Sequence, residues 1–184
     1  MIVIIDNGRG ADNISHIIRG SKLAKANAIP SGAEAYVISD GEVGGKNEKD
    51  IIKFLKSTNK PVLAIGAGYI HLGLAFGATV KNGACAKTEN ISVKQRCPIL
   101  LDFKKMFSAN HCQKTVLQNL PEEFGIMASS PKNEFEVIQH GTNPENPIDA
   151  LPFFGVHFNP EEGLDGVNIL RNFQQFVAMW NKYH

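Results

Sequence analysis

The chain has 184 residues, of which 43% are hydrophobic and 20% charged, and its formal net charge is +1. These values are ordinary for a globular protein and suit one domain over residues 1–184 with a sizeable core. The near-neutral charge argues against electrostatic capture of nucleic acid or of an anionic membrane surface.

No segment has the pattern of a targeting or membrane signal. The opening run Met1–Ile5 lacks a basic leader and is followed by Asp6, and no apolar run approaches the roughly 20 residues of a membrane helix. We therefore expect a cytoplasmic protein with no membrane partner. The irregular spacing of Cys85, Cys97 and Cys112 predicts neither a disulfide framework nor a metal site, and the absence of a phosphate-binding motif predicts no cofactor.

The first half of the chain alternates strand and helix patterns. Its first run, Ile2–Ile5, consists of apolar and mostly β-branched residues, which is typical of a buried parallel strand. The predicted elements are strands over 2–5, 27–29, 35–38 and 61–65, and helices over about 14–23, 47–57 and 69–76. This order predicts a parallel sheet with helices on both faces.

The second half of the chain has a different pattern. Short strands are predicted over 91–93, 115–117, 125–129, 136–138 and 153–158. The tail over 166–183 is an amphipathic helix, because its apolar residues recur at helical spacing. These residues are Val167, Leu170, Phe173, Phe176, Val177 and Trp180.

A tight turn of small residues, Gly66-Ala67-Gly68, joins the strand over 61–65 to the next helix. A strand–elbow–helix of this kind lifts a nucleophile out of a sheet and over a helix N-terminus. At the tip of this elbow stands Gly66, which has no side chain with which to attack a substrate.

The elbow resembles that of class I glutamine amidotransferases, which read P-V/I-L-G-I-C-x-G-H-Q. Gly66 stands in the place of the cysteine, Tyr69 in that of the histidine and Ile70 in that of the glutamine. The matching residues are Pro61, Val62, Leu63, Ile65 and Gly68. The continuation Leu74-Ala75-Phe76-Gly77 is similar to the glutaminase subunit of archaeal GMP synthetases.

A second motif supports the same resemblance. The family reads G-V-Q-F-H-P-E near the end of its catalytic region, and this chain reads Gly155-Val156-His157-Phe158-Asn159-Pro160-Glu161. Asn159 therefore stands in the place of the catalytic histidine and His157 in that of the glutamine, while the acidic residue of the triad is kept as Glu161. The resemblance covers nearly the whole chain and implies a three-layer α/β sandwich with a mostly parallel central sheet.

The two replacements remove the family's chemistry. Glutamine hydrolysis needs a thiolate to form a thioester, and a histidine to take and return the proton. Gly66 offers no sulfur, and the amide of Asn159 does not titrate in the useful range. The resemblance therefore predicts a protein without ordinary glutaminase activity, in which Glu161 has no imidazole to orient.

Other residues are candidates through the same resemblance. Ser39-Asp40-Gly41 stands where the family has S-G-G-P, the loop that gives an N–H to the oxyanion hole. Asp40 either puts a charge of the wrong sign beside that hole or is a solvated residue in a plain turn. Asn110 and His111 resemble the S-H pair that lines the glutamine pocket. The ligand-binding or oxyanion-loop candidates are Gly41, Ala67, Gly68, Tyr69, Ile70, Asn110, His111 and His157.

Two functions remain open from the sequence. The first is a non-catalytic protein that binds an ATP-pyrophosphatase synthetase subunit or a second amidotransferase-like chain, with Tyr69 and Ile70 partly closing the glutamine pocket. The second is an enzyme, either an active amidotransferase subunit in which Cys85 or Cys112 is the nucleophile or a hydrolase with altered chemistry. A buried, unreactive thiol is the simpler interpretation of both cysteines.

Overall fold

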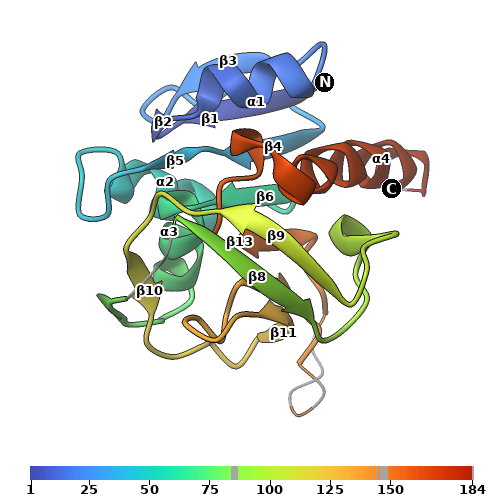
Figure 1. The fold of residues 1–184 in the computed structure, drawn as a ribbon. Coiled ribbons are helices and arrows are strands. Elements are labelled where there is room, and N and C mark those ends of the chain that lie inside the picture. Colours follow the sequence, from blue (N-terminus) through green and yellow to red (C-terminus); the bar gives the residue numbers. More distant parts are fainter. Residues whose placement is uncertain (84–86, 144, 146–148, 184) are drawn as a thin grey trace.

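The computed structural model describes residues 1–83, 87–143, 145 and 149–183 (Figure 1). The strands are β1 Ile2–Asp6, β2 Gly8–Arg9, β3 Lys22–Lys25, β4 Ala35–Ile38, β5 Asp40–Gly41, β6 Val62–Ile65, β7 Val80–Asn82, β8 Thr88–Val93, β9 Met106–Asn110, β10 Thr115–Leu117, β11 Phe124–Ser129, β12 Val137–His140 and β13 Phe153–Val156. The α-helices are α1 Ala11–Ile17, α2 Glu48–Leu55, α3 Ala67–Ala75 and α4 Val167–Tyr183. The short 3-10 helices are η1 Pro98–Leu100, η2 Pro160–Glu162 and η3 Leu164–Gly166.

A nine-stranded sheet, in the order β3-β1-β4-β6-β13-β12-β11-β8-β9, organises the fold. The five strands from β3 to β13 run parallel. The remaining four extend the sheet in antiparallel fashion. A separate ribbon of β2 and β5 sets Arg9 opposite Asp40 at the carboxyl ends of β1 and β4. The ends of neighbouring parallel strands are where α/β proteins place their sites.

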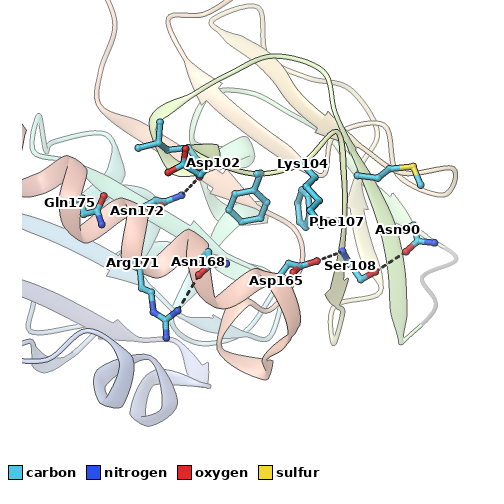
Figure 2. Close-up of a pocket in the computed structure, with 13 residues that line it drawn as sticks. Asn90, Asp102, Lys104, Phe107, Ser108, Asp165, Asn168, Arg171, Asn172 and Gln175 are labelled. Carbon is cyan, nitrogen blue, oxygen red and sulfur yellow. Dashed lines mark hydrogen bonds between the residues drawn. The ribbon is translucent and has the colours of Figure 1, made fainter.

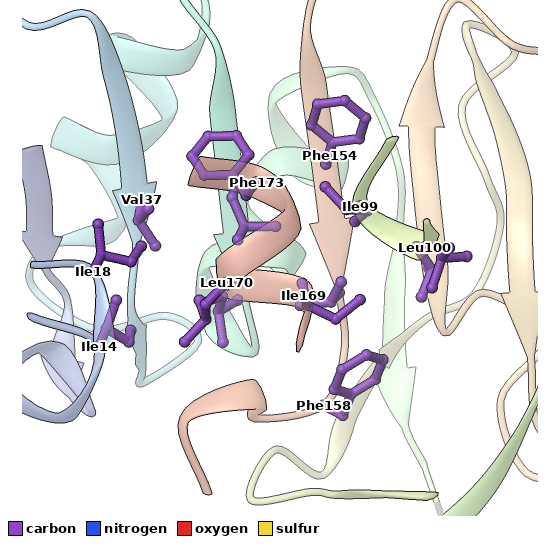
Figure 3. Packing of buried hydrophobic residues seen from close by; sticks show 14 of the residues in the cluster. Ile14, Ile18, Val37, Ile99, Leu100, Phe154, Phe158, Ile169, Leu170 and Phe173 are labelled. Atoms are coloured by element: carbon purple, nitrogen blue, oxygen red, sulfur yellow. The ribbon is translucent and has the colours of Figure 1, made fainter. Parts of the chain in front are cut away.

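Helices cover both faces of the parallel strands. On one face, α1 and α4 pack against the sheet, and Figure 3 shows Ile18, at the end of α1, beside Val37. On the other face, α2 and α3 pack against the alternate residues of the same strands, such as Val3 and Ile5. The predicted three-layer α/β sandwich with a mostly parallel central sheet is confirmed.

Two predictions near the N-terminus are wrong. The helix expected over about 14–23 ends at Ile17, and Lys22–Lys25 form the edge strand β3 instead. The strand expected over 27–29 is part of a turn. The reason is that β3 lies at the sheet edge with Leu23 half exposed, so its sequence shows neither strict alternation nor a continuous apolar run.

No helix among residues 1–83, 87–143, 145 and 149–183 is long and apolar enough to cross a membrane.

Candidate functional site

The predicted elbow forms where β6 ends and α3 begins. Gly66 has φ 56° and ψ −115°, a conformation that L side chains rarely adopt. Its N–H donates to the Val156 carbonyl at 3.0 Å and so ties the elbow to β13. A strained strand-to-helix turn is the geometry that presents a nucleophile above a sheet. The backbone for a nucleophile is therefore present although the side chain is missing.

The carboxylate of Asp40 lies directly over this elbow. Its Oδ1 accepts hydrogen bonds from the backbone N–H groups of Gly41 and Ala67, each at 2.8 Å. Gly41 belongs to the loop that resembles the family's oxyanion loop, and Ala67 follows the nucleophile position. An N–H after the nucleophile and an N–H from a loop are the usual donors of an oxyanion hole. Here both of these donors bind a carboxylate oxygen of the protein itself.

Arg9 and Asn159 hold the other oxygen of Asp40. Arg9 donates through Nε to Oδ2 at 2.9 Å and also forms an ion pair with it, and Asn159 Nδ2 donates to the same oxygen at 3.0 Å. The Asp40 side chain is fully buried, whereas that of Arg9 is 45% exposed. The expectation of a solvated Asp40 is therefore wrong, because protein donors replace its hydration. The expected charge conflict is also absent, because the carboxylate is itself the anion that the N–H groups bind.

Asp40 leaves no room for a side chain at the elbow. A Cβ added to Gly66 would lie 2.4 Å from both Cγ and Oδ1 of Asp40. Non-bonded heavy atoms need roughly 3.5 Å or more between carbon centres. A side chain at position 66 and Asp40 in this rotamer therefore exclude each other.

Asn159 links Asp40 to Glu161. Asn159 Nδ2 lies 3.2 Å from Glu161 Oε1 as well as 3.0 Å from Asp40 Oδ2, and its Oδ1 accepts a hydrogen bond from the Cys112 N–H at 2.9 Å. Burial raises the pKa of the Glu161 carboxyl to about 7, and the negative charges of Asp40 and Glu162 act in the same direction. Hydrogen bonds to the carboxylate lower this pKa but do not outweigh burial. The structure thus brings Asn159 and Glu161 together within a network that centres on Asp40.

The three residues after Ala67 are buried against the core. Gly68 is needed for close packing, because a Cβ there would lie 2.8 Å from Ile38 Cγ2. Ile70 belongs to the core on the α2 and α3 face, and Tyr69 donates its hydroxyl to the Phe135 carbonyl at 2.6 Å. Both side chains are fully buried. The group that fills the space over Gly66 is Asp40, rather than Tyr69 or Ile70 as expected from the sequence.

His111 and His157 face away from the elbow and toward Glu136. His111 Nε2 lies 2.9 Å from Glu136 Oε2, and His157 Nδ1 lies 3.7 Å from the same atom. Burial alone raises the pKa of Glu136, but the two imidazoles outweigh it and lower the pKa to about 2.

Asn110 contributes its carbonyl to the Asn159 N–H at 2.8 Å and its amide to the Glu162 carbonyl at 3.1 Å. Sequence reasoning missed Glu136 and Arg9, because neither lies in a motif of the family.

The cysteines were the candidates for a replacement nucleophile. Cys112 is exposed near the site, but burial and the carboxylates around it raise the pKa of its thiol more than Arg9 lowers it. The neighbouring His111 ring is turned to Glu136. Cys97 is buried, which raises the pKa of its thiol to about 11. Cys85 lies outside the described residues. Neither described thiol has the lowered pKa of an activated nucleophile.

Two hollows lie at the surface near these elements. One of about 320 Å³ borders the site and is lined by residues that include Arg9, Gly41 and Lys46. A larger one of about 680 Å³ lies between α4 and β9, where Arg171 donates to Asn168 and Asn172 donates to the Leu101 carbonyl (Figure 2). The larger hollow is not part of the elbow, since its lining comes from β8, β9, α4, η3 and the loop after η1.

The fold and the elbow define a three-layer α/β protein with the site geometry of an amidotransferase. The family model for glutamine amidotransferase class-I matches residues 21–175, so the chain belongs to this family. This confirms the resemblance found in the elbow and triad motifs.

Three known proteins are similar to this chain in sequence or structure. The glutamine-hydrolyzing GMP synthase subunit of Methanocaldococcus jannaschii is 27% identical over 187 residues, which cover 94% of this chain and 95% of that protein. A putative GMP synthase subunit from Thermoplasma acidophilum has a similar structure, with a TM-score of 0.86, 23% identity and coverage of 98% and 95% of the two chains. A glutamine amidotransferase from Thermotoga maritima is more distant, with a TM-score of 0.66, 12% identity and coverage of 99% and 83%.

The first prediction concerns the stability that Asp40 provides. Asp40→Ala removes the acceptor of two backbone N–H groups and of Asn159, and each buried donor left unpaired costs about 1–3 kcal/mol. We expect the free energy of unfolding in urea to fall by roughly 2–4 kcal/mol. The matched control is Asp50→Ala on the exposed side of α2, which should change it by no more than about 0.5 kcal/mol. Equal, small effects of the two changes would contradict this account of Asp40.

The second prediction concerns pH. Because the pKa of Glu161 is higher in the folded state than its ordinary value of 4.5, the folded protein keeps a proton that the unfolded chain releases. Stability from this group is therefore greatest below pH 4.5 and is lost as the pH rises to about 7. One pKa unit corresponds to about 1.4 kcal/mol, so the rise from 4.5 to about 7 corresponds to a loss of at most about 3–4 kcal/mol.

Glu161→Gln should remove this loss while keeping the oxygen that accepts the Asn159 hydrogen bond. We expect the variant to be more stable than the unchanged protein at pH 8 and to differ much less at pH 5, as measured by urea unfolding. Glu122→Gln, at an exposed position in the loop before β11, is the control. A stability difference independent of pH would show that Glu161 is ionised throughout.

Proposed function

We propose that this chain is an amidotransferase-like protein, of the type found as the glutaminase subunit of GMP synthases, that does not hydrolyse glutamine and acts by binding a synthetase chain. Such a role belongs to purine biosynthesis in the cytoplasm. Residues 1–184 act as one domain, because a single sheet takes strands from β1 near the N-terminus to β13 just before α4.

The observation that carries the loss of activity is the position of Asp40. An amidotransferase binds the negative oxygen of its tetrahedral intermediate with preorganised N–H groups. In this chain the N–H groups of Gly41 and Ala67 already bind a buried carboxylate. The nucleophile and the base are missing at Gly66 and Asn159 as well. The nucleophile and the base are therefore absent, and the donors of the oxyanion hole are already occupied by Asp40.

The alternative, an active amidotransferase or a hydrolase, needs a thiolate near the elbow. The Cys112 thiol lacks a base, because the imidazole of His111 is bonded to Glu136. Its raised pKa favours the unreactive thiol form. A chloroketone analogue of glutamine should therefore label no cysteine in a glutamine-protected manner.

The binding role rests on what the chain keeps. The elbow backbone, Gly68 and Gly155 are retained, although the reacting groups are not. The relative from M. jannaschii is, by its name, one subunit of a synthase. We infer that the surface around the elbow binds an ATP-pyrophosphatase synthetase subunit, with a second amidotransferase-like chain as the other candidate partner.

The third prediction tests the loss of activity by reconstruction. The unchanged protein should release no glutamate from glutamine. Gly66→Cys with Asn159→His should remain nearly inactive, because the new Cβ meets Asp40 and the oxyanion donors stay occupied. Adding Asp40→Gly, which restores the family's residue, should raise the rate by roughly 10²-fold or more, the usual effect of an oxyanion-hole donor.

Two controls define the result. Asp40→Gly alone should remain inactive, since it supplies no nucleophile, and circular dichroism should show that each variant is folded. Glutamate release by the unchanged protein would overturn the proposal. An equally active double variant would show that Asp40 does not block the site.

The fourth prediction tests the partner. We expect the purified protein to bind an ATP-pyrophosphatase synthetase subunit in a calorimetric titration, and the pair to make product from free ammonia but not from glutamine. Lys46→Glu, beside the elbow, should weaken binding several-fold, because charges at the rim of an interface steer association. Lys182→Glu, at the far end of α4, should not. Equal effects of the two variants would place the interface elsewhere.

A further inference from the structure

A cluster of three buried side chains lies behind the elbow and has no place in the proposed function. His111 follows β9, Glu136 precedes β12 and His157 follows β13. One ligand atom from each residue lies within 4.8 Å of the other two, and each of the three side chains is at most 1% exposed. The cluster joins the antiparallel part of the sheet to the last parallel strand.

The hydrogen bonds of His157 fix which of its ring nitrogens carries a proton. Nε2 lies 2.9 Å from the Thr115 carbonyl oxygen. A carbonyl only accepts, so Nε2 must donate, and in a neutral ring Nδ1 is then a bare acceptor. Nδ1 is buried, has no hydrogen-bond partner among the described residues, and faces Glu136 Oε2 at 3.7 Å.

In the neutral form of His157, this arrangement leaves two electron-rich atoms facing each other, out of contact with bulk solvent. A lone pair and a carboxylate oxygen repel each other, most strongly in a buried site of low dielectric. A proton on Nδ1 would make an imidazolium that forms an ion pair with Oε2 at 3.7 Å, although this distance is too long for a hydrogen bond. A cation between the two atoms removes the repulsion.

The spacing suits a small, tetrahedral metal ion. Two ligands at the usual Zn²⁺ distances of 2.0–2.2 Å lie about 3.4 Å apart in tetrahedral geometry. Glu136 Oε2 is 2.9 Å from His111 Nε2 and 3.7 Å from His157 Nδ1. These two separations lie on either side of that value, and the third pair of ligand atoms lies within 4.8 Å, so a metal ion would draw the three side chains into one coordination shell with one position left open.

One imidazole and the carboxylate also have outer contacts of the kind that metal ligands make, whereas His111 Nδ1 has no hydrogen-bond partner among the described residues. Metal-binding imidazoles usually donate their other N–H to a carbonyl or carboxylate, as His157 does to Thr115. Ligand carboxylates are usually hydrogen-bonded in turn, and Ser130 Oγ donates to Glu136 Oε1 at 2.7 Å. Two imidazoles and one carboxylate form a known three-ligand set for zinc, whereas Mg²⁺ and Ca²⁺ prefer oxygen.

We propose that His111 Nε2, Glu136 Oε2 and His157 Nδ1 bind one divalent transition-metal ion of the zinc class. This site was not predicted from the spacing of the three residues in the sequence, and it is independent of glutamine chemistry and of the partner. Its effect is to stabilise the packing behind α3, where Tyr69 contacts both the His157 ring and the Phe135 carbonyl.

The test uses the full chain without a histidine tag, stripped with a chelator and then dialysed against Zn²⁺. We expect about one zinc ion per chain by mass spectrometry, and a higher melting temperature with Zn²⁺ than without it. Glu136→Gln and His157→Gln should each lower the affinity by more than about 100-fold, beyond the usual effect of an outer contact. The family's glutamine at position 157 indicates that the fold accepts the second change.

Two further variants make the outcome decisive. Ser130→Ala removes only an outer contact and should weaken zinc binding by roughly 10–100-fold. His16→Gln removes an exposed histidine on α1 and should leave binding unchanged. A folded, stripped protein that takes up no zinc and gains no thermal stability from it would overturn the proposal. So would full zinc binding by the folded His157→Gln protein.

Discussion

The carboxylate of Asp40 is the interaction on which the arrangement of the site depends. It is fully buried and accepts hydrogen bonds from four parts of the chain: Gly41 in its own loop, Ala67 at the start of α3, Arg9 in β2 and Asn159 after β13. Each donor fixes the end of a different strand or helix. An anion is well placed at this point, because the N-terminus of α3 and its free N–H groups favour negative charge. The site thus keeps the N–H donors of an anion-binding elbow, and the anion that they bind is the protein's own Asp40 carboxylate.

The family relationship explains why such a carboxylate is stable here. Class I amidotransferases build donors at the elbow to bind an oxygen that becomes negative during the reaction. Once the thiol and the imidazole are replaced by Gly66 and Asn159, these donors would stay buried and unpaired, which is costly. Asp40 satisfies them. Asn159 in turn spans the distance to Glu161, so a chain of polar contacts replaces the catalytic triad.

The fold could be predicted from the sequence where its elements are buried and regular. The runs Ile2–Ile5 and Ala35–Ile38 identified β1 and β4, and the elbow and the Asn159 motif identified the site, because these patterns depend on local sequence. The edge strand β3 and the polar strand β9 were missed, since they are held by neighbours rather than by their own apolar pattern. The burial of Asp40 and the meeting of Glu136 with His111 and His157 depend on segments far apart in the chain, and no spacing in the sequence reveals them.

The 2.4 Å approach between Asp40 and a side chain at position 66 also has an evolutionary consequence. The two replacements are not independent historical events, because an ancestor with both a cysteine at the elbow and Asp40 in this rotamer would have had overlapping atoms. Loss of the thiol before Asp40 arose avoids this overlap, whereas the opposite order requires Asp40 to adopt another rotamer. A cysteine regained at position 66 likewise requires Asp40 to change its rotamer or to be replaced. The geometry makes the loss of the nucleophile hard to reverse one mutation at a time.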